Sequence, residues 1–240
     1  MGATFEVAEA VFALAPGYRR HVVLARGAAH LTPPAHLATR FDAAVAALVG
    51  RADLDTLAEH PAVRPWRLAF KAAGWNPGKF RSSIEALLRR ALRGELEPLG
   101  LSAVDAGTVV TLEHLVPVGV HILDDLGPDP ALVLGPAAGD ETFQLFGGQV
   151  ESPDPGEIVY RVGPVVLTRR WVWRQGAVGS VTPQARSYAV NVDVVDASVL
   201  DGSAAVAAMT EVLGWCGLQV TGALTLDATT PAGRVDEGLG

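Results

Sequence analysis

The sequence changes character at Pro117, and this change limits the folds that the chain can adopt. Before Pro117, apolar residues recur at helical spacing in stretches that end at glycine or proline, at 34–49, 63–73, 84–92 and 101–115. After it, short apolar runs separated by Gly, Pro and Asp predict strands at 119–123, 131–134, 142–146, 158–162, 165–168 and 188–195. A strand is also predicted at 22–25, a helix at 203–215 and a last strand at 218–226. Helices followed by strands predict an α+β fold.

Length and composition indicate one packed domain. The chain has 240 residues, of which 49% are hydrophobic and 19% charged, and no linker divides it. We expect a single domain over 1–228 and a frayed tail over 229–240. No apolar run approaches the ~20 residues of a membrane span, and the N-terminus lacks the pattern of a secretory signal. The expected location is therefore cytoplasmic.

The net charge of −7 hides two strongly basic stretches. Residues 61–94 contain eight basic residues and one acid, and residues 158–190 contain five arginines and no acid. The remainder holds 6 basic and 25 acidic residues. Because phosphate binding depends on the local field, this distribution is compatible with a nucleic-acid partner. The alternative is two solvated arginine surfaces.

The segment Gly74-Trp75-Asn76-Pro77-Gly78-Lys79 is not a phosphate loop, because its two glycines are one residue too close and Phe80 replaces the required Ser or Thr. It does place Lys79 and Arg81 at the start of a predicted helix. Free amides and the helix dipole favour anions there, so a phosphate contact is one interpretation. A plain surface turn is the other.

The segment 169–175 is the most informative stretch of the sequence. As a strand, it places Arg169, Trp171, Trp173 and Gln175 on one side and Arg170 and Arg174 on the other. The tryptophans could then stack on a base or an aromatic side chain while the guanidinium groups hold phosphate. The alternative is a tryptophan-lined core face with arginines in water.

Histidine and cysteine give no metal-site pattern. The six histidines show no ligand spacing with cysteine or acids, and Cys216 has no partner cysteine. His121 lies inside a predicted strand, with Asp124 three residues later. The pair could position a water molecule, or His121 could be a packed histidine. No metal site is predicted.

Four segments, in order, resemble the B3/4 domain, the editing domain of bacterial phenylalanyl-tRNA synthetase beta chains. They are WRLAFKAAGWNPGKFRSSIEALLRRAL at 66–92, VDAGTVVTLEHLVPVGVHILD at 104–124, PGEIVY at 155–160 and TRRWVWRQ at 168–175. The resemblance implies a layered α+β fold built on a β-sandwich-like mixed sheet with packed helices. It also implies a pocket that receives the 3′ end of a mischarged tRNA and hydrolyses the aminoacyl ester without a cofactor.

The functional residues of the family can be assigned to positions of this sequence only in part. Val104 and Asp105 match the family, whereas Gly107 and Thr108 occupy its next pair, and Glu113 and Pro117 align without a gap. The family's pocket histidine corresponds to His121 if two residues are inserted after Pro117, and to Gly119 otherwise. Its pocket glutamate, which recognises a tyrosine hydroxyl, is absent or replaced by Gln175.

The resemblance therefore implies a trans-acting editing factor that acts on the acceptor end of aminoacyl-tRNA. The expected roles are catalysis by His121 with Thr108, substrate binding, and contact with tRNA phosphates. The substrate-binding set is Trp171, Trp173, Gln175, Glu113 and Asp124, and the phosphate-binding set is Lys79, Arg81, Arg169, Arg170 and Arg174. Two alternatives stay open: a non-catalytic binding module for a tRNA 3′ end, a nucleotide or an aromatic amino acid, and a protein that binds or hydrolyses small molecules.

Overall fold

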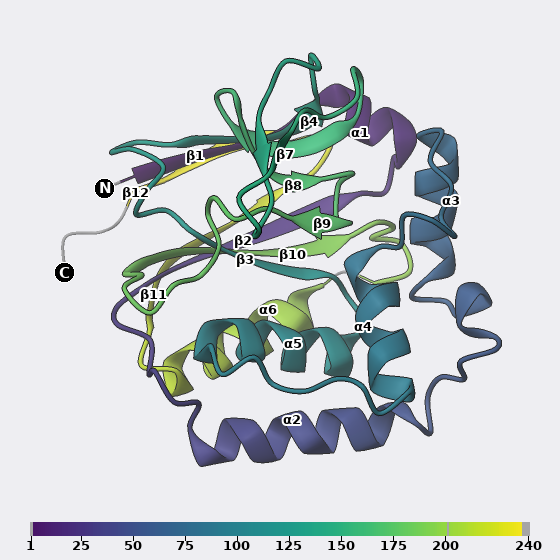
Figure 1. The fold of residues 1–240 in the computed structure, drawn as a ribbon, viewed down its shortest axis with the longest axis vertical. Helices are drawn as coiled ribbons and strands as arrows, with labels where there is room; N and C mark the ends of the chain where they lie inside the picture. Colours follow the sequence, from purple (N-terminus) through teal and green to yellow (C-terminus); the bar gives the residue numbers. More distant parts are fainter. Residues whose placement is uncertain (1, 201, 237–240) are drawn as a thin grey trace.

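The computed structural model describes residues 2–200 and 202–236 as two stacked β-sheets with helices below the second sheet (Figure 1). The first sheet has six strands in the order β12-β1-β4-β7-β8-β9. Its strands are β12 (Ala232–Asp236), β1 (Gly2–Val7), β4 (Ala131–Pro136), β7 (Ile158–Val162), β8 (Val165–Arg169) and β9 (Arg174–Gln175). Strands β1 and β4 are parallel, and the other pairs are antiparallel.

The second sheet has four antiparallel strands in the order β11-β2-β10-β3. Its strands are β11 (Gln219–Leu226), β2 (Arg19–Arg26), β10 (Ser187–Val194) and β3 (Val118–Ile122). Every residue of β10 is buried, because the strand lies in the middle of this sheet with layers on both faces. A separate hairpin pairs β5 (Phe143–Gln144) with β6 (Val150–Glu151).

Three helices form the layer below the second sheet: α2 (Ala35–Leu48), α5 (Ser102–His114) and α6 (Ser203–Trp215) (Figure 1). The remaining helices are α1 (Glu9–Leu14), the 3₁₀ turn η1 (Leu57–Glu59), α3 (Arg64–Ala72) and α4 (Ser83–Leu92). Helix α4 has Glu85 in its first turn and Arg89 and Arg90 in its last, as the helix dipole favours.

The two faces of the second sheet have different chemistry, and this difference creates the site described below. In β3, Val118, Val120 and Ile122 pack against the helices. Since side chains alternate along a strand, Gly119 and His121 face the first sheet. In β10, Val190, Val192 and Val194 likewise belong to the helix-side core, so that Asn191 and Asp193 face the first sheet. Polar groups thus enter an otherwise apolar space between the sheets.

The predicted α+β fold with a layered sandwich and packed helices is confirmed, with local differences. The tail predicted to fray from Thr229 contains β12, which pairs with β1 through residues 232–236. Residues 237–240 of that prediction lie outside the described residues. The segment 169–175 is not one strand: β8 ends at Arg169, a turn follows, and β9 begins at Arg174.

Candidate functional site

A cavity of about 80 Å³ lies between the two sheets, close to β9 and β3. The second sheet contributes Arg20, Gly119, His121, Asn191 and Asp193 to its wall. The first sheet and its connecting turn contribute Tyr160, Thr168, Trp171, Trp173, Arg174 and Gln175. Five residues predicted for the site (His121, Trp171, Trp173, Arg174 and Gln175) therefore line one cavity, as does Gly119, the other candidate for the family's histidine position.

His121 is the buried histidine of this cavity, with only 3% of its surface exposed. Its Nε2 lies 3.2 Å from Thr168 Oγ1 across the gap between the sheets, and its ring meets the Tyr160 ring edge-on at 5.2 Å. Burial, helped by the positive charge of Arg20, lowers the pKa of His121 to about 3. The imidazole is therefore neutral at physiological pH.

Arg20 is held beside His121 by a buried ion pair. Its Nε donates to Asp193 Oδ1 at 2.8 Å and its Nη2 donates to Asp193 Oδ2 at 3.2 Å. The Tyr18 hydroxyl donates to the same Asp193 Oδ1 at 2.5 Å. Because Asp193 neutralises the guanidinium, the cavity contains a fixed hydrogen-bond donor without a large net charge.

Several polar atoms around this cavity are buried and have no hydrogen-bond partner among the residues that the structure describes. They are His121 Nδ1, Arg20 Nη1, Asn191 Oδ1, Tyr160 Oη and Trp171 Nε1. The Tyr160 hydroxyl lies near the Asn191 amide and the Arg20 guanidinium, without the geometry of a hydrogen bond to either. Buried polar groups are normally paired, because each unpaired one costs about 1–3 kcal/mol. All five residues belong to the lining of this one small cavity, which indicates a site for water or for a polar group of a ligand.

The turn between β8 and β9 positions the two tryptophans. Arg170 and Trp171 have positive φ angles of 44° and 67°, which are uncommon outside glycine. Trp171 is buried and packs edge-on against Tyr18 and Trp66, at centroid distances of 5.0 and 5.5 Å. Trp173 is half-buried and packs against Phe80. The single strand face predicted for them is therefore wrong, although both side chains line the cavity.

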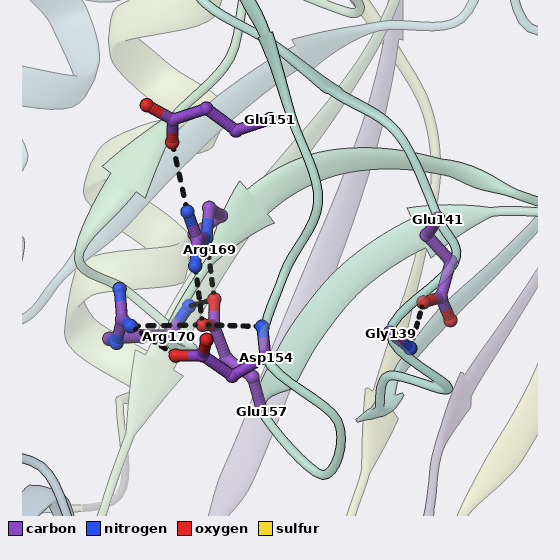
Figure 2. Close-up of polar contacts among 7 residues, drawn as sticks. All are labelled: Gly139, Glu141, Glu151, Asp154, Glu157, Arg169 and Arg170. Carbon is purple, nitrogen blue, oxygen red and sulfur yellow. Dashed lines mark hydrogen bonds and ion pairs between the residues drawn. The ribbon is translucent and has the colours of Figure 1, made fainter.

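Arg169 and Arg170, predicted to bind phosphates, are paired instead with three carboxylates, of which Glu157 is buried (Figure 2). Arg169 donates through Nε and Nη2 to the two oxygens of Glu157, at 2.8 and 2.7 Å, and through Nη1 to Glu151 at 3.0 Å. Arg170 donates to Asp154 at 2.8 Å and lies 3.2 Å from Glu157. Their positive charges are already compensated, so neither side chain is free for a phosphate, and this group fixes the turn that carries the tryptophans.

The cations that are exposed near the cavity are Lys79, Arg81 and Arg174. The Arg174 guanidinium lies 5.8 Å from the centre of the Trp173 ring at the cavity wall. Lys79 lies over the ring of Phe80, which itself packs against Trp173. Of the five predicted phosphate-binding residues, Lys79 and Arg174 therefore remain available to a ligand at the rim, whereas the Arg81 guanidinium lies 3.9 Å from the buried Glu85.

The helices α3 and α4 carry several exposed cations. Glu85, the one acid in residues 61–94, is 0% exposed and accepts hydrogen bonds from Arg67 at 2.9 Å and Arg89 at 3.0 Å. The stretch therefore shows no negative charge at the surface, whereas Lys71, Arg90 and Arg93 are exposed. The Ser83 amide donates to Val172 O at 2.7 Å, which joins α4 to the wall of the cavity.

Thr108, Glu113 and Asp124 lie outside this cavity. The Thr108 hydroxyl donates to Val104 O within α5. Glu113 accepts two hydrogen bonds from Arg40, each of 2.8 Å. Asp124 accepts backbone hydrogen bonds from the loop just before β10 and from its first residue. These three contacts hold secondary structure together, and none of them lies among the groups around His121.

Six polar residues of the cavity lining were not predicted as site residues: Arg20, Ser83, Tyr160, Thr168, Asn191 and Asp193. A signal was present for Asn191 and Asp193, because they interrupt the apolar run of the strand SYAVNVDV, whereas Arg20 stands among other polar residues at the start of RRHVVLAR. A charged residue at an inward position of a buried strand needs a partner, and Arg20 and Asp193 are each other's partner. Tyr160 gave no such signal, since tyrosine is common in plain strands.

Acid is expected to weaken folding through His121. The unfolded histidine takes up a proton near its ordinary pKa of 6.5, whereas the folded one does so only at about 3. Between these two pH values the unfolded state binds more protons than the folded state. This residue therefore lowers the free energy of unfolding by about 1.4 kcal/mol for each unit by which the pH falls. Urea unfolding of wild type and His121→Gln at pH 7, 5 and 4 measures the difference. Equal pH slopes for the two proteins would contradict a neutral buried histidine.

Neither a metal cluster nor a membrane-spanning helix is found in the part of the chain that the structure describes. Over residues 2–200 and 202–236, no group of three or more His, Cys, Asp or Glu side chains is placed to hold a metal ion. Within the same residues, no helix is long and apolar enough to cross a membrane.

Comparison with known proteins identifies the class of domain. The family model of the B3/4 domain matches residues 65–213, more than half of the chain. The protein therefore belongs to the B3/4 domain family, and the resemblance found in the sequence is confirmed. The match includes the segments that carry His121, the β8–β9 turn and Asn191.

Among solved structures, the chain is similar to an N-terminal fragment of the phenylalanyl-tRNA synthetase beta subunit from Pyrococcus horikoshii, with 12% identity and a TM-score of 0.42. The match covers 91% of this chain and 50% of that fragment, so the chain spans about half the length of the fragment. A search of curated proteins found no match.

Proposed function

We propose that the cavity between the sheets hydrolyses the ester of mischarged aminoacyl-tRNA, so that the protein acts as a trans-acting editing factor. The observation that carries this proposal is that His121, Arg20, Asn191 and Tyr160 line one cavity, and that each has a buried polar atom without a hydrogen-bond partner among the described residues. An ester carbonyl and an attacking water together need both donors and acceptors, which these side chains supply.

The proposed chemistry assigns orientation to the histidine and charge stabilisation to the donors opposite it. His121 Nδ1 accepts a hydrogen bond from the attacking water, while the Thr168 hydroxyl holds its Nε2 in place. Arg20 Nη1 and Tyr160 Oη donate to the ester carbonyl oxygen as it gains negative charge. An aminoacyl ester is already reactive, so positioning and stabilisation supply most of the effect, and no strong base is needed.

The size of the cavity determines what part of the substrate enters it. About 80 Å³ accommodates an ester group with a water molecule, but not a complete aminoacyl-adenosine. The amino-acid side chain and the terminal ribose therefore lie at the rim, against Trp173 and Gln175. Thr108, Glu113 and Asp124 have no role in this proposal, because they lie outside the cavity.

The tRNA backbone is proposed to approach from the basic side of the rim. Lys79 and Arg174 contact phosphates near the acceptor end, and the exposed cations of α3 and α4 add further positive charge. Arg169 and Arg170 are excluded from this contact by their carboxylate partners. A tRNA substrate agrees with the cytoplasmic location expected from the sequence.

Release of labelled amino acid from a panel of mischarged tRNAs tests the proposal. The panel pairs near-cognate amino acids with several tRNAs, so that the amino acid that is removed can be identified. We expect at least one pair to be deacylated much faster than in buffer, and correctly charged pairs to survive. If every ester keeps its buffer lifetime at saturating protein, the hydrolytic proposal fails.

Removing one rim cation is expected to weaken tRNA binding in a salt-dependent manner. Arg174→Gln should weaken binding about 2- to 10-fold at low salt and reduce the slope of log K against log salt by about 1. Arg234→Gln is the matched control, since Arg234 is also exposed but lies on β12, at the opposite edge of the same sheet. Filter binding across a salt series measures both slopes. Equal losses in the two variants would contradict a rim contact.

A second candidate function is a binding module for the tRNA 3′ end that lacks turnover. The observation that favours it is the low proton affinity of His121, which makes the imidazole a poor general base. This candidate predicts the same salt-sensitive binding and the same effect of Arg174→Gln. It differs in one outcome, since every aminoacyl ester in the panel then remains intact while bound.

A further inference from the structure

A second, larger cavity lies next to the cavity of His121. It has a volume of about 260 Å³ and shares Asp193 with the cavity of His121. The Asp193 amide donates to Pro117 O at 3.0 Å, and Pro117 lines the smaller cavity but not the larger one. Trp66 lines the larger cavity and Trp171 the smaller, and their rings touch edge-on at 5.5 Å. The cavities are therefore neighbours with different walls.

The wall of the larger cavity is mainly apolar. Trp66 and Val116 are buried in its lining, and Val195 is half-buried there. Val199 and Leu200 complete the lining although they are 67% and 40% exposed. Large apolar side chains left in water beside a hollow are a feature of ligand sites. A cavity of roughly 150 Å³ is enough for a benzene ring, so this one holds a phenyl or branched aliphatic group with a small polar head.

Two opposite charges belong to the same lining. Arg51 is exposed, and its Nη1 donates to Glu113 O at 2.9 Å, which fixes the guanidinium without neutralising its charge. Asp196 is half-exposed, and its Oδ1 accepts hydrogen bonds from the Ser198 amide at 3.0 Å and hydroxyl at 2.6 Å. Neither forms an ion pair with a described residue in the structure. One positive and one negative group beside an apolar space suit a ligand that carries both charges.

The two histidines of this cavity differ in availability. His60 uses both ring nitrogens, since Nδ1 accepts from the Ala62 amide at 3.1 Å and Nε2 lies 3.3 Å from Arg51 O. His114, at the end of α5, has no hydrogen bond with the described residues, and burial lowers the pKa of its imidazole. Its ring offers a neutral donor or acceptor to the polar head of a ligand.

We infer that this cavity binds a free apolar α-amino acid. The aromatic or branched side chain packs against Trp66 and Val116, the carboxylate meets Arg51 and the ammonium group meets Asp196. The inference goes beyond the proposed hydrolysis, because it concerns a second site that needs neither tRNA nor turnover. A ligand here also contacts the strand end that holds Asp193, and so lies next to the ion pair of the His121 cavity.

Isothermal titration calorimetry of the full chain with L-phenylalanine and L-leucine tests the inference. We expect at least one to bind, and 3-phenylpropionate and phenethylamine, which each lack one charge, to bind at least about tenfold more weakly. Arg51→Gln and Asp196→Asn should each weaken binding by about tenfold. Val199→Asp should abolish it while the protein stays folded, since Val199 is 67% exposed.

The variant His121→Ala distinguishes amino-acid binding in this cavity from binding in the neighbouring cavity. Amino-acid binding that persists in His121→Ala but is lost in Val199→Asp supports the inference, even if no aminoacyl-tRNA is hydrolysed. Binding that is lost in His121→Ala and kept in Arg51→Gln places the ligand in the other cavity and overturns it. Absence of binding by both amino acids at millimolar concentration also overturns it, whatever the deacylation assay shows.

Discussion

Replacing Glu157 by alanine is expected to lower the free energy of unfolding by about 3–5 kcal/mol. The Glu157 side chain is 0% exposed and compensates Arg169 and Arg170, which are themselves buried (Figure 2). Its loss leaves two guanidinium groups out of water, with only the half-buried Glu151 and the exposed Asp154 as partners. Urea unfolding followed by tryptophan fluorescence measures the change, because Trp171 and Trp173 follow these arginines directly in the chain.

Asp154→Ala is the matched control for this change. Asp154 also pairs with Arg170, at 2.8 Å, but its side chain is 75% exposed. An exposed ion pair contributes about 0–1 kcal/mol, so the control should unfold nearly as the wild type does. A small loss in Glu157→Ala, similar to that of Asp154→Ala, would contradict a buried ion group that fixes the turn.

Replacing His121 by alanine is expected to lower kcat/KM for deacylation by about 10²- to 10³-fold. The change removes the acceptor for the attacking water, while Arg20 and Tyr160 remain to bind the carbonyl oxygen. Because the unpaired buried Nδ1 is removed as well, we expect stability at neutral pH to change much less than activity. Single-turnover release of amino acid from the best tRNA of the panel measures the rate.

Thr108→Ala is the control for position. Thr108 was expected from the family resemblance to assist His121, but its hydroxyl bonds to Val104 O in α5 and does not line the cavity. The structure therefore predicts wild-type kinetics for Thr108→Ala. Equal losses in the two variants would show that the reaction takes place at a site other than the cavity between the sheets.

The sequence was sufficient for the five longest helices and for the family, whereas β1, α1, η1 and β6 were not predicted. Helices predicted at 34–49, 63–73, 84–92, 101–115 and 203–215 correspond to α2, α3, α4, α5 and α6 within one residue at each end. These segments have clear apolar periodicity and glycine or proline stops. Strand β12 was missed because Ala232–Asp236 has little apolar content and is held by pairing with β1, far away in the sequence.

The site was only partly predictable, for a physical reason. The prediction of alternating side chains along 169–175 assumed an unbroken strand. In the structure Glu157 accepts hydrogen bonds from the Arg169 side chain and the Arg170 amide, and the backbone turns at positive φ between β8 and β9. An ion pair between residues twelve positions apart leaves no periodic trace in a sequence. His121 was identified from its place in a strand, but its unpaired Nδ1 and its neighbour Arg20 emerge only when the two sheets are stacked.

The most direct test of the central claim is the ¹⁵N NMR signal of the His121 imidazole during titration with a non-hydrolysable aminoacyl-adenosine analogue. The chain has six histidines, and His121→Gln assigns the signal. If the ester group enters the cavity between the sheets, the His121 nitrogens shift on binding while His30 and His36 stay constant. A saturating analogue that leaves the His121 signal unchanged would contradict the account.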